Sequence, residues 1–414
     1  MTCGCSRRDF LAHGLYGIGV GAALPMFLSR TSAALTAQAL QGTSVEKHPE
    51  RILVVVELSG GNDGLNTVVP HGDPAYYRAR PHLGIPEREV IKVTEGFGFH
   101  PSMVGFERLY KDGQMAVVHG CGYDHPSFSH FSSMSYWHTG VPNGGETLGW
   151  LGRLADDHYN PATRNVIVNI GLSQSLAVRS GRHSPLVFDD PVRFRREGTD
   201  AEKRALGAMS EAASASNPAL DFLVATARNA AASSDFVRQA SAAYRTPVDY
   251  GIGNAFGGGL QRVAALIAAN MPTRVYYVVY QGNSFDTHVQ QADLHSRLLM
   301  YTADAVRAFM QDIARIGRGD DVAVMMFTEF GRRVEENGSL GTDHGTATPM
   351  FLFGKHVTGG FFGKAPSLTD LDDGNLKMTN DFRRVYATVI KEWLGYDDTA
   401  AVLKGRFEPL GIFA

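Results

Sequence analysis

Six short runs rich in Val, Ile, Tyr and Phe constrain the fold of this chain more than any other feature. They are apolar at nearly every position, without the alternation of a strand that has one face in water. Runs of this kind are typical of strands that are buried on both faces of a sheet. They span residues 52–58, 115–119, 166–170, 275–280, 322–327 and 350–353.

Helical patterns separate these runs, at residues 103–111, 128–138, 217–244, 260–269 and 290–316. In the last pattern, apolar residues recur every three or four positions and predict one buried face. They are Leu294, Leu298, Tyr301, Ala305, Phe309 and Ile313. The alternation predicts an α/β fold with a mostly parallel central sheet and helices on both faces. Residues 201–256, rich in Ala and Ser, are expected to form a helical insertion or cap within it.

The beginning of the chain is typical of a twin-arginine export signal. Arg7 and Arg8 are followed by Phe10 and Leu11, then by an apolar run at 15–28 that is short for a membrane span. Small residues around Ala37 suit cleavage, so we expect residues 1–39 to be removed and residues 45–414 to form one α/β domain. The twin-arginine translocation machinery would then be a partner and the protein periplasmic or secreted, without a stable membrane span. An uncleaved N-terminal anchor is the alternative.

Cysteine content and charge narrow the class of protein further. Cys3 and Cys5 lie in the expected signal, which leaves only Cys121 and no internal disulfide, so stability must come from a large apolar core. The chain has 39 basic and 42 acidic residues; removing three arginines and one aspartate with the signal leaves 36 and 41, a net charge of −5. Nucleic acid is therefore not an expected partner.

The loop after the first predicted strand is rich in glycine and polar residues. Gly60 and Gly61 allow a sharp turn and a close approach to a ligand, and Asp63 and Asn66 offer oxygen atoms to a cation. A plain Gly-Asn-Asp-Gly turn is the alternative for this motif taken alone.

Histidines and serines follow the second predicted strand. His119 ends it, and Ser129 and His130 come a few residues later. A hydroxyl beside an imidazole is a candidate nucleophile or polar ligand. A structural role for the histidines, and a helix cap for Ser129, are the alternatives.

Two Asp and His pairs follow later strands. Asp286 and His288 lie two residues apart after the strand at 275–280, although Asp286 could instead cap a helix. Asp343 and His344 are adjacent between glycines, an arrangement that presents a carboxylate and an imidazole to one divalent metal. Because carboxyl ends of parallel strands meet at one edge of a sheet, these residues predict a shared crevice with one or two metal ions.

Taken together, the motifs resemble the domain of unknown function 1501 family, which is grouped with the alkaline phosphatase and sulfatase-like superfamily. The resemblance covers nearly the whole chain after the signal. It is carried by the segments 60–66, 129–131, 285–288, 329–332 and 341–344.

The resemblance implies an alkaline-phosphatase-like fold that binds one or two divalent metals, with zinc, manganese, calcium and magnesium as the usual ions. The residues it maps onto metal ligands are Asp63, Asp286, His288, Asp343 and His344. Many relatives have an aspartate at the position of Asn66, so the first-strand ligand is weakened here or moved to Asp63.

The same resemblance bears on the nucleophile. The Cys-x-Pro-x-Arg motif of sulfatases is absent, and Cys121 is followed by Gly-Tyr-Asp, which argues against formylglycine chemistry. Ser129 is the best hydroxyl candidate, followed by Ser127. His130 and Arg332 are expected as catalytic donors to the oxygens of the transferred group.

The sequence thus favours an exported metal-dependent hydrolase of a phosphate or sulfate ester, whose small-molecule or glycan substrate it does not identify. The alternative is a superfamily member that binds a ligand or envelope partner without turnover. A metal-free serine hydrolase is a third option, which the absence of a Gly-x-Ser-x-Gly motif disfavours.

Overall fold

The computed structural model describes residues 47–195, 218–251 and 253–414, and four single positions between 195 and 218. The predicted signal at 1–39 and part of the predicted insertion at 201–256 lie outside these residues. The chain divides into two compact units: residues 45–195 with 233–414, and residues 1–44 with 196–232. In the second unit the described residues belong mainly to the first part of helix α8 (Pro218–Ala243).

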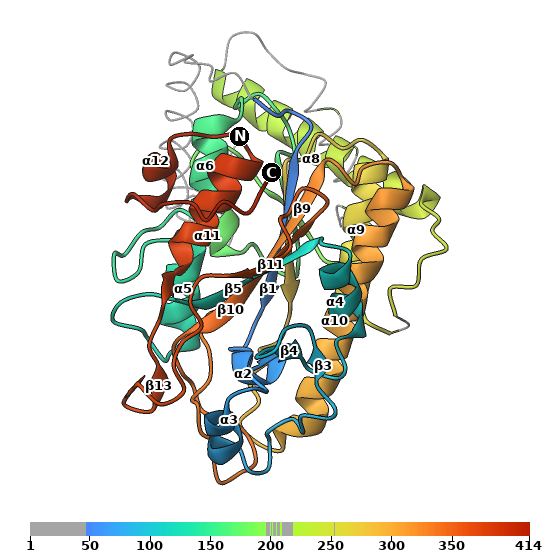
Figure 1. Cartoon of the computed structure of the whole chain (residues 1–414). Helices are drawn as coiled ribbons and strands as arrows, with labels where there is room; N and C mark the ends of the chain where they lie inside the picture. Colours follow the sequence, from blue (N-terminus) through green and yellow to red (C-terminus); the bar gives the residue numbers. More distant parts are fainter. Residues whose placement is uncertain are drawn as a thin grey trace, which may run out of the picture. The chain divides into compact units, whose positions relative to one another are not determined.

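A nine-stranded sheet lies at the centre of the larger unit, in the order β11-β5-β10-β9-β1-β8-β6-β7, with β14 beside β5 (Figure 1). Only β10 runs antiparallel to its neighbours, β5 and β9. The strands are β1 (Ile52–Leu58), β5 (Met115–Gly122), β6 (Ile167–Ile170), β7 (Leu186–Phe188), β8 (Val275–Tyr280), β9 (Val322–Phe327), β10 (Thr348–Gly354), β11 (Gly360–Phe362) and β14 (Asn380–Asp381). The mostly parallel sheet and all six predicted strands are confirmed.

Helices cover both faces of this sheet because its central strands are apolar on both sides. Along β1, Val54 and Val56 pack into one core and Leu53 and Val55 into the other. The first face is covered by α4 (Val104–Lys111), α9 (Ala255–Ala268) and α10 (Gln291–Arg315). The second is covered by α5 (His130–Thr139), α6 (Trp150–His158), α11 (Phe382–Thr388) and α12 (Thr399–Leu403).

The buried face of α10 is only partly as predicted. Leu298, Ala305, Phe309 and Ile313 are buried, whereas Leu294 and Tyr301 are 40% and 37% exposed. His295 and Thr302, one residue further along, are buried instead. The centre of the stripe is therefore held by polar residues, which a search for apolar periodicity passes over.

Smaller elements flank the carboxyl ends of the strands. A three-stranded sheet is formed by β2 (Val68–Val69), β4 (Gly98–Phe99) and β3 (Ile91–Lys92), next to the short helices α2 (Gly64–Thr67) and α3 (Pro74–Ala79). The remaining elements are η1 (Leu176–Val178), η2 (Val389–Trp393) and the hairpin of β12 (Leu371–Asp372) and β13 (Asn375–Leu376). Among the described helices, none is long and apolar enough to span a membrane.

Three buried histidines predict an acid-sensitive fold. Burial lowers the pKa of His295 to about 3 and the pKa values of His100 and His119 to about 4, from 6.5. At a pH between about 4 and 6.5, these histidines bind protons in the unfolded chain but not in the folded one. The free energy of unfolding therefore falls as the pH drops below about 6.5. In a His119→Phe variant this fall should be shallower by up to about 1.4 kcal/mol per pH unit. Urea unfolding between about pH 7 and 4 tests this, and equally steep curves for both proteins would contradict it.

Candidate functional site

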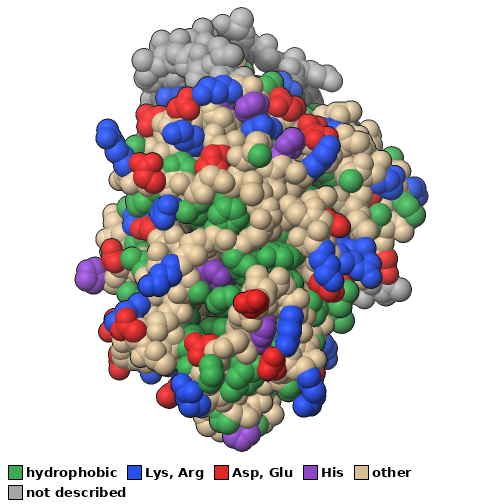
Figure 2. All heavy atoms as spheres, in the orientation of Figure 1, with side chains coloured by type: hydrophobic (Ala, Val, Ile, Leu, Met, Phe, Trp, Pro, Cys, Tyr) green, Lys and Arg blue, Asp and Glu red, His purple; other side chains and the backbone are tan. Residues whose placement is uncertain are grey.

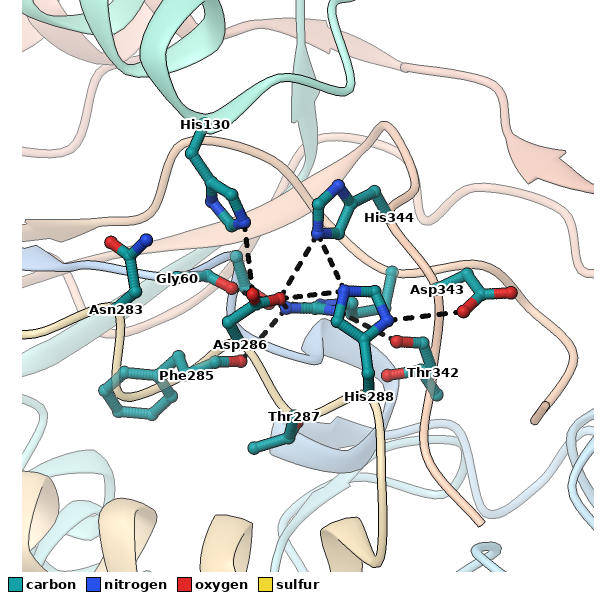
Figure 3. A network of polar contacts seen from close by, with 12 residues as sticks. Gly60, His130, Asn283, Phe285, Asp286, Thr287, His288, Thr342, Asp343 and His344 are labelled. Atoms are coloured by element: carbon teal, nitrogen blue, oxygen red, sulfur yellow. Dashed lines mark hydrogen bonds and ion pairs between the residues drawn. The ribbon is translucent and has the colours of Figure 1, made fainter. Parts of the chain in front are cut away.

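The candidate site lies at the carboxyl-terminal edge of the sheet, where four segments meet (Figure 3). Asp286 and His288 come from the loop between β8 and α10, and His130 is the first residue of α5. His344 lies in the loop before β10, where its backbone forms a bridge with Arg332. The antiparallel direction of β10 brings its beginning, and so His344, to the edge where the parallel strands end.

The loop after β1 packs against the loop after β8 at a distance that requires glycine. Gly60 has a φ of +119°, and a Cβ atom there would lie 2.5 Å from the backbone nitrogen of Asp286. The Gly60 nitrogen donates to the Glu329 carboxylate, 2.9 Å from Oε1. The glycine pair predicted to allow a close approach therefore approaches protein, and holds Asp286 in place.

Three imidazole nitrogens surround the carboxylate of Asp286. Nε2 of His288 lies 3.0 Å from Oδ1, and Nε2 of His344 lies 3.2 Å from the same oxygen. Nε2 of His130 lies 3.4 Å from Oδ2 and has no hydrogen bond to any described residue. We call these four residues, His130, Asp286, His288 and His344, the Asp286 cluster.

The other nitrogen of each imidazole faces an oxygen atom. Nδ1 of His130 is 2.8 Å from Oε1 of Glu329, and Nδ1 of His344 is 2.7 Å from the carbonyl oxygen of Phe128. Nδ1 of His288 is 3.3 Å from Oδ1 of Asp343. Carbonyl and carboxylate oxygens accept hydrogen bonds, so in the tautomer protonated at Nδ1 each imidazole satisfies its outer contact, and Nε2 would then offer a lone pair to a cation.

The charges around the cluster favour an ionised carboxylate at its centre. Burial opposes ionisation of Asp286, but hydrogen bonds and charge from Arg332 and hydrogen bonding by His344 hold its pKa below the usual range. The hydrogen bond to Glu329 raises the pKa of His130, whereas burial lowers the pKa of His344. The cluster thus combines an anionic oxygen with imidazoles of unequal basicity.

The donor set fits a divalent cation. Ligand atoms of His130, Asp286 and His344 lie within 4.8 Å of one another, and Nε2 of His288 lies 2.9 Å from Nε2 of His344. Two imidazole lone pairs repel at that distance unless a proton or a cation lies between them. Three imidazoles with one carboxylate are a ligand set that suits zinc and other first-row metals. Each imidazole also has the partner behind it that metal-binding histidines usually have.

Arg332, expected from the sequence to donate to the transferred group, has its guanidinium nitrogens engaged by the protein. Its side chain is fully buried, and its Nη2 donates to Oδ1 of Asp286 at 2.7 Å. Its other donors reach the carbonyl oxygens of Gly60, Gly61 and Thr342. A guanidinium with all its nitrogens engaged by the protein has none left for a substrate oxygen, so Arg332 is a positioning residue.

Asp63, predicted as a metal ligand, lies outside the Asp286 cluster. Its carboxylate is fully buried, with Oδ2 2.6 Å from both Nη1 of Arg80 and Nε2 of Gln291. Burial alone would raise the pKa of Asp63, but the charge and hydrogen bond of Arg80 hold it below the usual range. Asn66 accepts from the same arginine at 2.7 Å. This first-strand aspartate stabilises the loop through an ion pair, and neither residue faces the cluster.

Neither predicted hydroxyl group makes a hydrogen bond to an imidazole of the cluster. Ser129 is exposed at the N-cap of α5, and its hydroxyl makes no hydrogen bond to the described residues. Ser127 accepts from the backbone nitrogen of Ser129 at 3.2 Å. The structure therefore holds neither hydroxyl in a fixed position against an imidazole.

Two residues of the site were not assigned a role from the sequence. Glu329 is buried directly after β9 and supports both His130 and Gly60, and a charged residue at the end of an apolar strand is a signal for such a role. Phe330 is 2% exposed, with its ring centre 4.9 Å from that of His130 and 4.6 Å from that of His344. It forms an apolar wall on one side of the cluster.

A family model described as a protein of unknown function, DUF1501, matches residues 50–406. The match covers the sheet and every residue of the Asp286 cluster. No match was found among curated proteins.

Several solved structures resemble the chain at low sequence identity. A protein in the alkaline phosphatase superfamily from Vibrio parahaemolyticus is 8% identical, with 87% of this chain and 70% of that chain covered and a TM-score of 0.40. The lipoteichoic acid synthase LtaP from Listeria monocytogenes is 9% identical over 90% and 80%, with a TM-score of 0.40. The C-terminal periplasmic domain of EcEptC from Escherichia coli, in complex with zinc, is 9% identical over 76% and 74%, with a TM-score of 0.33. These TM-scores are low, so function has to be inferred from this chain's own residues.

The positioning role of Arg332 predicts a large loss of stability on its replacement. An Arg332→Met variant leaves Asp286 and several carbonyl groups without their donor, which should lower the free energy of unfolding by about 3–5 kcal/mol. Arg333→Met is the matched control, because Arg333 is partly exposed and 3.6 Å from an exposed Asp373; it should cost less than about 1 kcal/mol. Denaturant unfolding of the two variants measures this, and equal, small losses would contradict the assignment.

Proposed function

The chain belongs to the DUF1501 family, and we propose that it is an exported, metal-dependent hydrolase of phosphate or sulfate esters. The observation that carries this proposal is the Asp286 cluster, in which three imidazole Nε2 atoms converge on one carboxylate. An acceptor on the outer side of each imidazole orients its ring. A fold gains from assembling such an arrangement only if the inward-facing Nε2 atoms bind something.

The four side chains of the cluster would hold the metal, and Asp343 would support His288 from behind. A divalent cation there supplies Lewis acidity toward the oxygen atoms of a phosphate or sulfate ester. Zinc fits the nitrogen-rich donors best, whereas calcium and magnesium prefer oxygen ligands. Two further points support a metal site here: the family resemblance, and the position of the Asp286 cluster at the carboxyl edge of a parallel sheet.

The protein's own residues prepare the site for this chemistry. Arg332 holds Asp286 in position. Glu329 accepts a hydrogen bond from Nδ1 of His130, which keeps Nε2 of His130 free. Phe330 excludes water from one side of His130 and His344. Asp343, with its side chain 56% exposed, marks the side from which a substrate can enter. Ser129, directly before His130, remains the proposed nucleophile, and its exposed hydroxyl can turn toward the cluster.

Export is part of the proposal. The twin-arginine route carries folded proteins, which suits a protein that must take up its metal before it reaches the periplasm. The paired arginines Arg7 and Arg8 are the sequence support for this route.

The second candidate function is binding without turnover. The observation that favours it is the Ser129 hydroxyl, which makes no hydrogen bond to the described residues and so has no base beside it. In this reading the metal site would hold an anionic ligand or envelope partner in place.

Metal analysis combined with ester turnover separates the two functions. The exported protein should contain about one or two equivalents of a divalent metal and hydrolyse p-nitrophenyl phosphate or sulfate. His344→Ala should lose the metal and at least about a hundredfold in kcat/KM. Asp320→Asn is the matched control, because Asp320 also contacts a histidine, His356 at 3.1 Å, but on an exposed surface; it should change neither.

The results of this experiment test both the assignment of the metal site and the choice between the two functions. Metal retained in His344→Ala would overturn the assignment of the site. Metal present and lost as expected, without turnover of either ester by the unaltered protein, would support the binding function instead.

Asp343 gives a sharper test of how the site is built. If it supports His288 rather than binding the metal, Asp343→Asn should weaken metal affinity by about 10–100-fold without abolishing binding. A competition titration with a metal chelator measures this. Complete loss of metal, as in His344→Ala, would instead make Asp343 a direct ligand.

A further inference from the structure

A cavity of about 400 Å³ lies between β5, the three-stranded sheet and the beginning of β10. Its volume is within the range of about 300–1,000 Å³ that small-molecule sites occupy. Its lining is mainly apolar and includes Leu65, Val68, Phe97, His119, Thr348 and Leu368. Of the described residues that line it, none belongs to the Asp286 cluster. Figure 2 shows hydrophobic side chains gathered on this face, over the region where Figure 1 places α2, β4, β5 and β11.

His119 is one of the polar residues that line this cavity. Its side chain packs against two neighbouring aromatic rings, with its ring centre 4.9 Å from that of Phe361 and 4.7 Å from that of Phe97. The residue is only 7% exposed, and its ring nitrogens make no hydrogen bond to any described residue. Burial lowers the pKa of His119 to about 4, so the neutral ring offers one donor and one acceptor. These ring nitrogens are therefore free to bond to a ligand in the cavity.

Thr348 is a second polar group without a partner in the wall of the cavity. The residue is 1% exposed, and its hydroxyl has no hydrogen bond to the described residues. The strand register shifts between Thr348 and Met350, where Pro349 has no N–H to donate. Such irregularities re-aim side chains, and they are frequent next to binding sites.

The charges that line the cavity select against an anion. Asp73 and Glu95 both line it, and both carry carboxylates. Arg332 also lines it, but the donors of its guanidinium are engaged by backbone carbonyls and Asp286. A phosphate, sulfate or carboxylate would therefore meet negative charge without an available cation.

We propose that this cavity binds a small, uncharged, mainly aromatic molecule through a hydrogen bond between its hydroxyl group and the imidazole of His119. The aromatic rings of Phe97 and Phe361 fix the imidazole, and the apolar walls take up the hydrocarbon part of the ligand. The site is independent of the metal-dependent chemistry proposed for the Asp286 cluster.

Phenol and toluene are the probes that test this proposal, because they are similar in size but only phenol has a hydroxyl group. Phenol should bind the full-length protein with one-to-one stoichiometry, more tightly than toluene, and shift the side-chain nitrogen resonances of His119. In His119→Phe, which keeps the aromatic stacking, phenol should bind roughly three- to tenfold more weakly, while toluene binding should not weaken. Thr348→Val is a second variant, and it changes the shape of its side chain less than His119→Phe does. Benzoate, which is an anion, should not bind.

The His344→Ala variant keeps this test separate from the proposed function, since phenol should bind it as it binds the unaltered protein. The proposal is overturned if neither phenol nor toluene binds, or if crystals soaked in phenol show only water in the cavity. It is also overturned if folded His119→Phe binds phenol as tightly as the unaltered protein does.

Discussion

The arrangement at the carboxyl edge of the sheet depends on one buried guanidinium. Arg332 donates to the carbonyl oxygens of Gly60 and Gly61 after β1, of Phe285 after β8 and of Thr342 before β10, and to the Asp286 carboxylate. These segments are far apart in sequence, and without Arg332 the carbonyl groups of Gly60, Gly61 and Thr342 would have no donor among the described residues. A buried arginine is tolerated here because every donor has an acceptor and one acceptor is charged. The same contacts determine where Asp286 points, so the geometry of the cluster follows from the packing of the loops.

In this arrangement, the carboxylates near the edge of the sheet have different roles. Asp63 is paired with Arg80, and Glu329 accepts from Gly60 and His130, so both are used within the fold. Asp286 is paired as well, but it remains partly exposed and is surrounded by imidazole nitrogens with lone pairs. Burial and hydrogen bonding thus separate structural carboxylates from the one that is available to a cation.

The sequence predicted the framework of this fold well, because buried parallel strands are apolar along their whole length and their ends mark one edge of the sheet. The runs at 52–58, 275–280 and 322–327 coincide with β1, β8 and β9, which places Asp286 and His288 at this edge, and the antiparallel β10 brings His344 to the same edge. The sequence could not assign Asp63 or Arg332, because their partners, Arg80 and the backbone carbonyls of other loops, are fixed only by tertiary packing. It predicted the buried face of α10 only in part, because it did not include His295, whose Nε2 donates to Oδ1 of Asn62.

Both candidate sites contain an imidazole whose hydrogen-bonding capacity is not fully used by the described residues. His295 and His183 are as buried as His119, yet each has a protein partner for its Nε2. The Nε2 of His130 and the ring of His119 have none among the described residues, and each faces a space that a ligand can occupy. Their surroundings differ in sign and polarity: an anionic carboxylate with further imidazoles in one case, and two phenylalanine rings in the other. The surroundings of each ring therefore indicate which ligand it can take, a cation at the first and an uncharged hydroxyl group at the second.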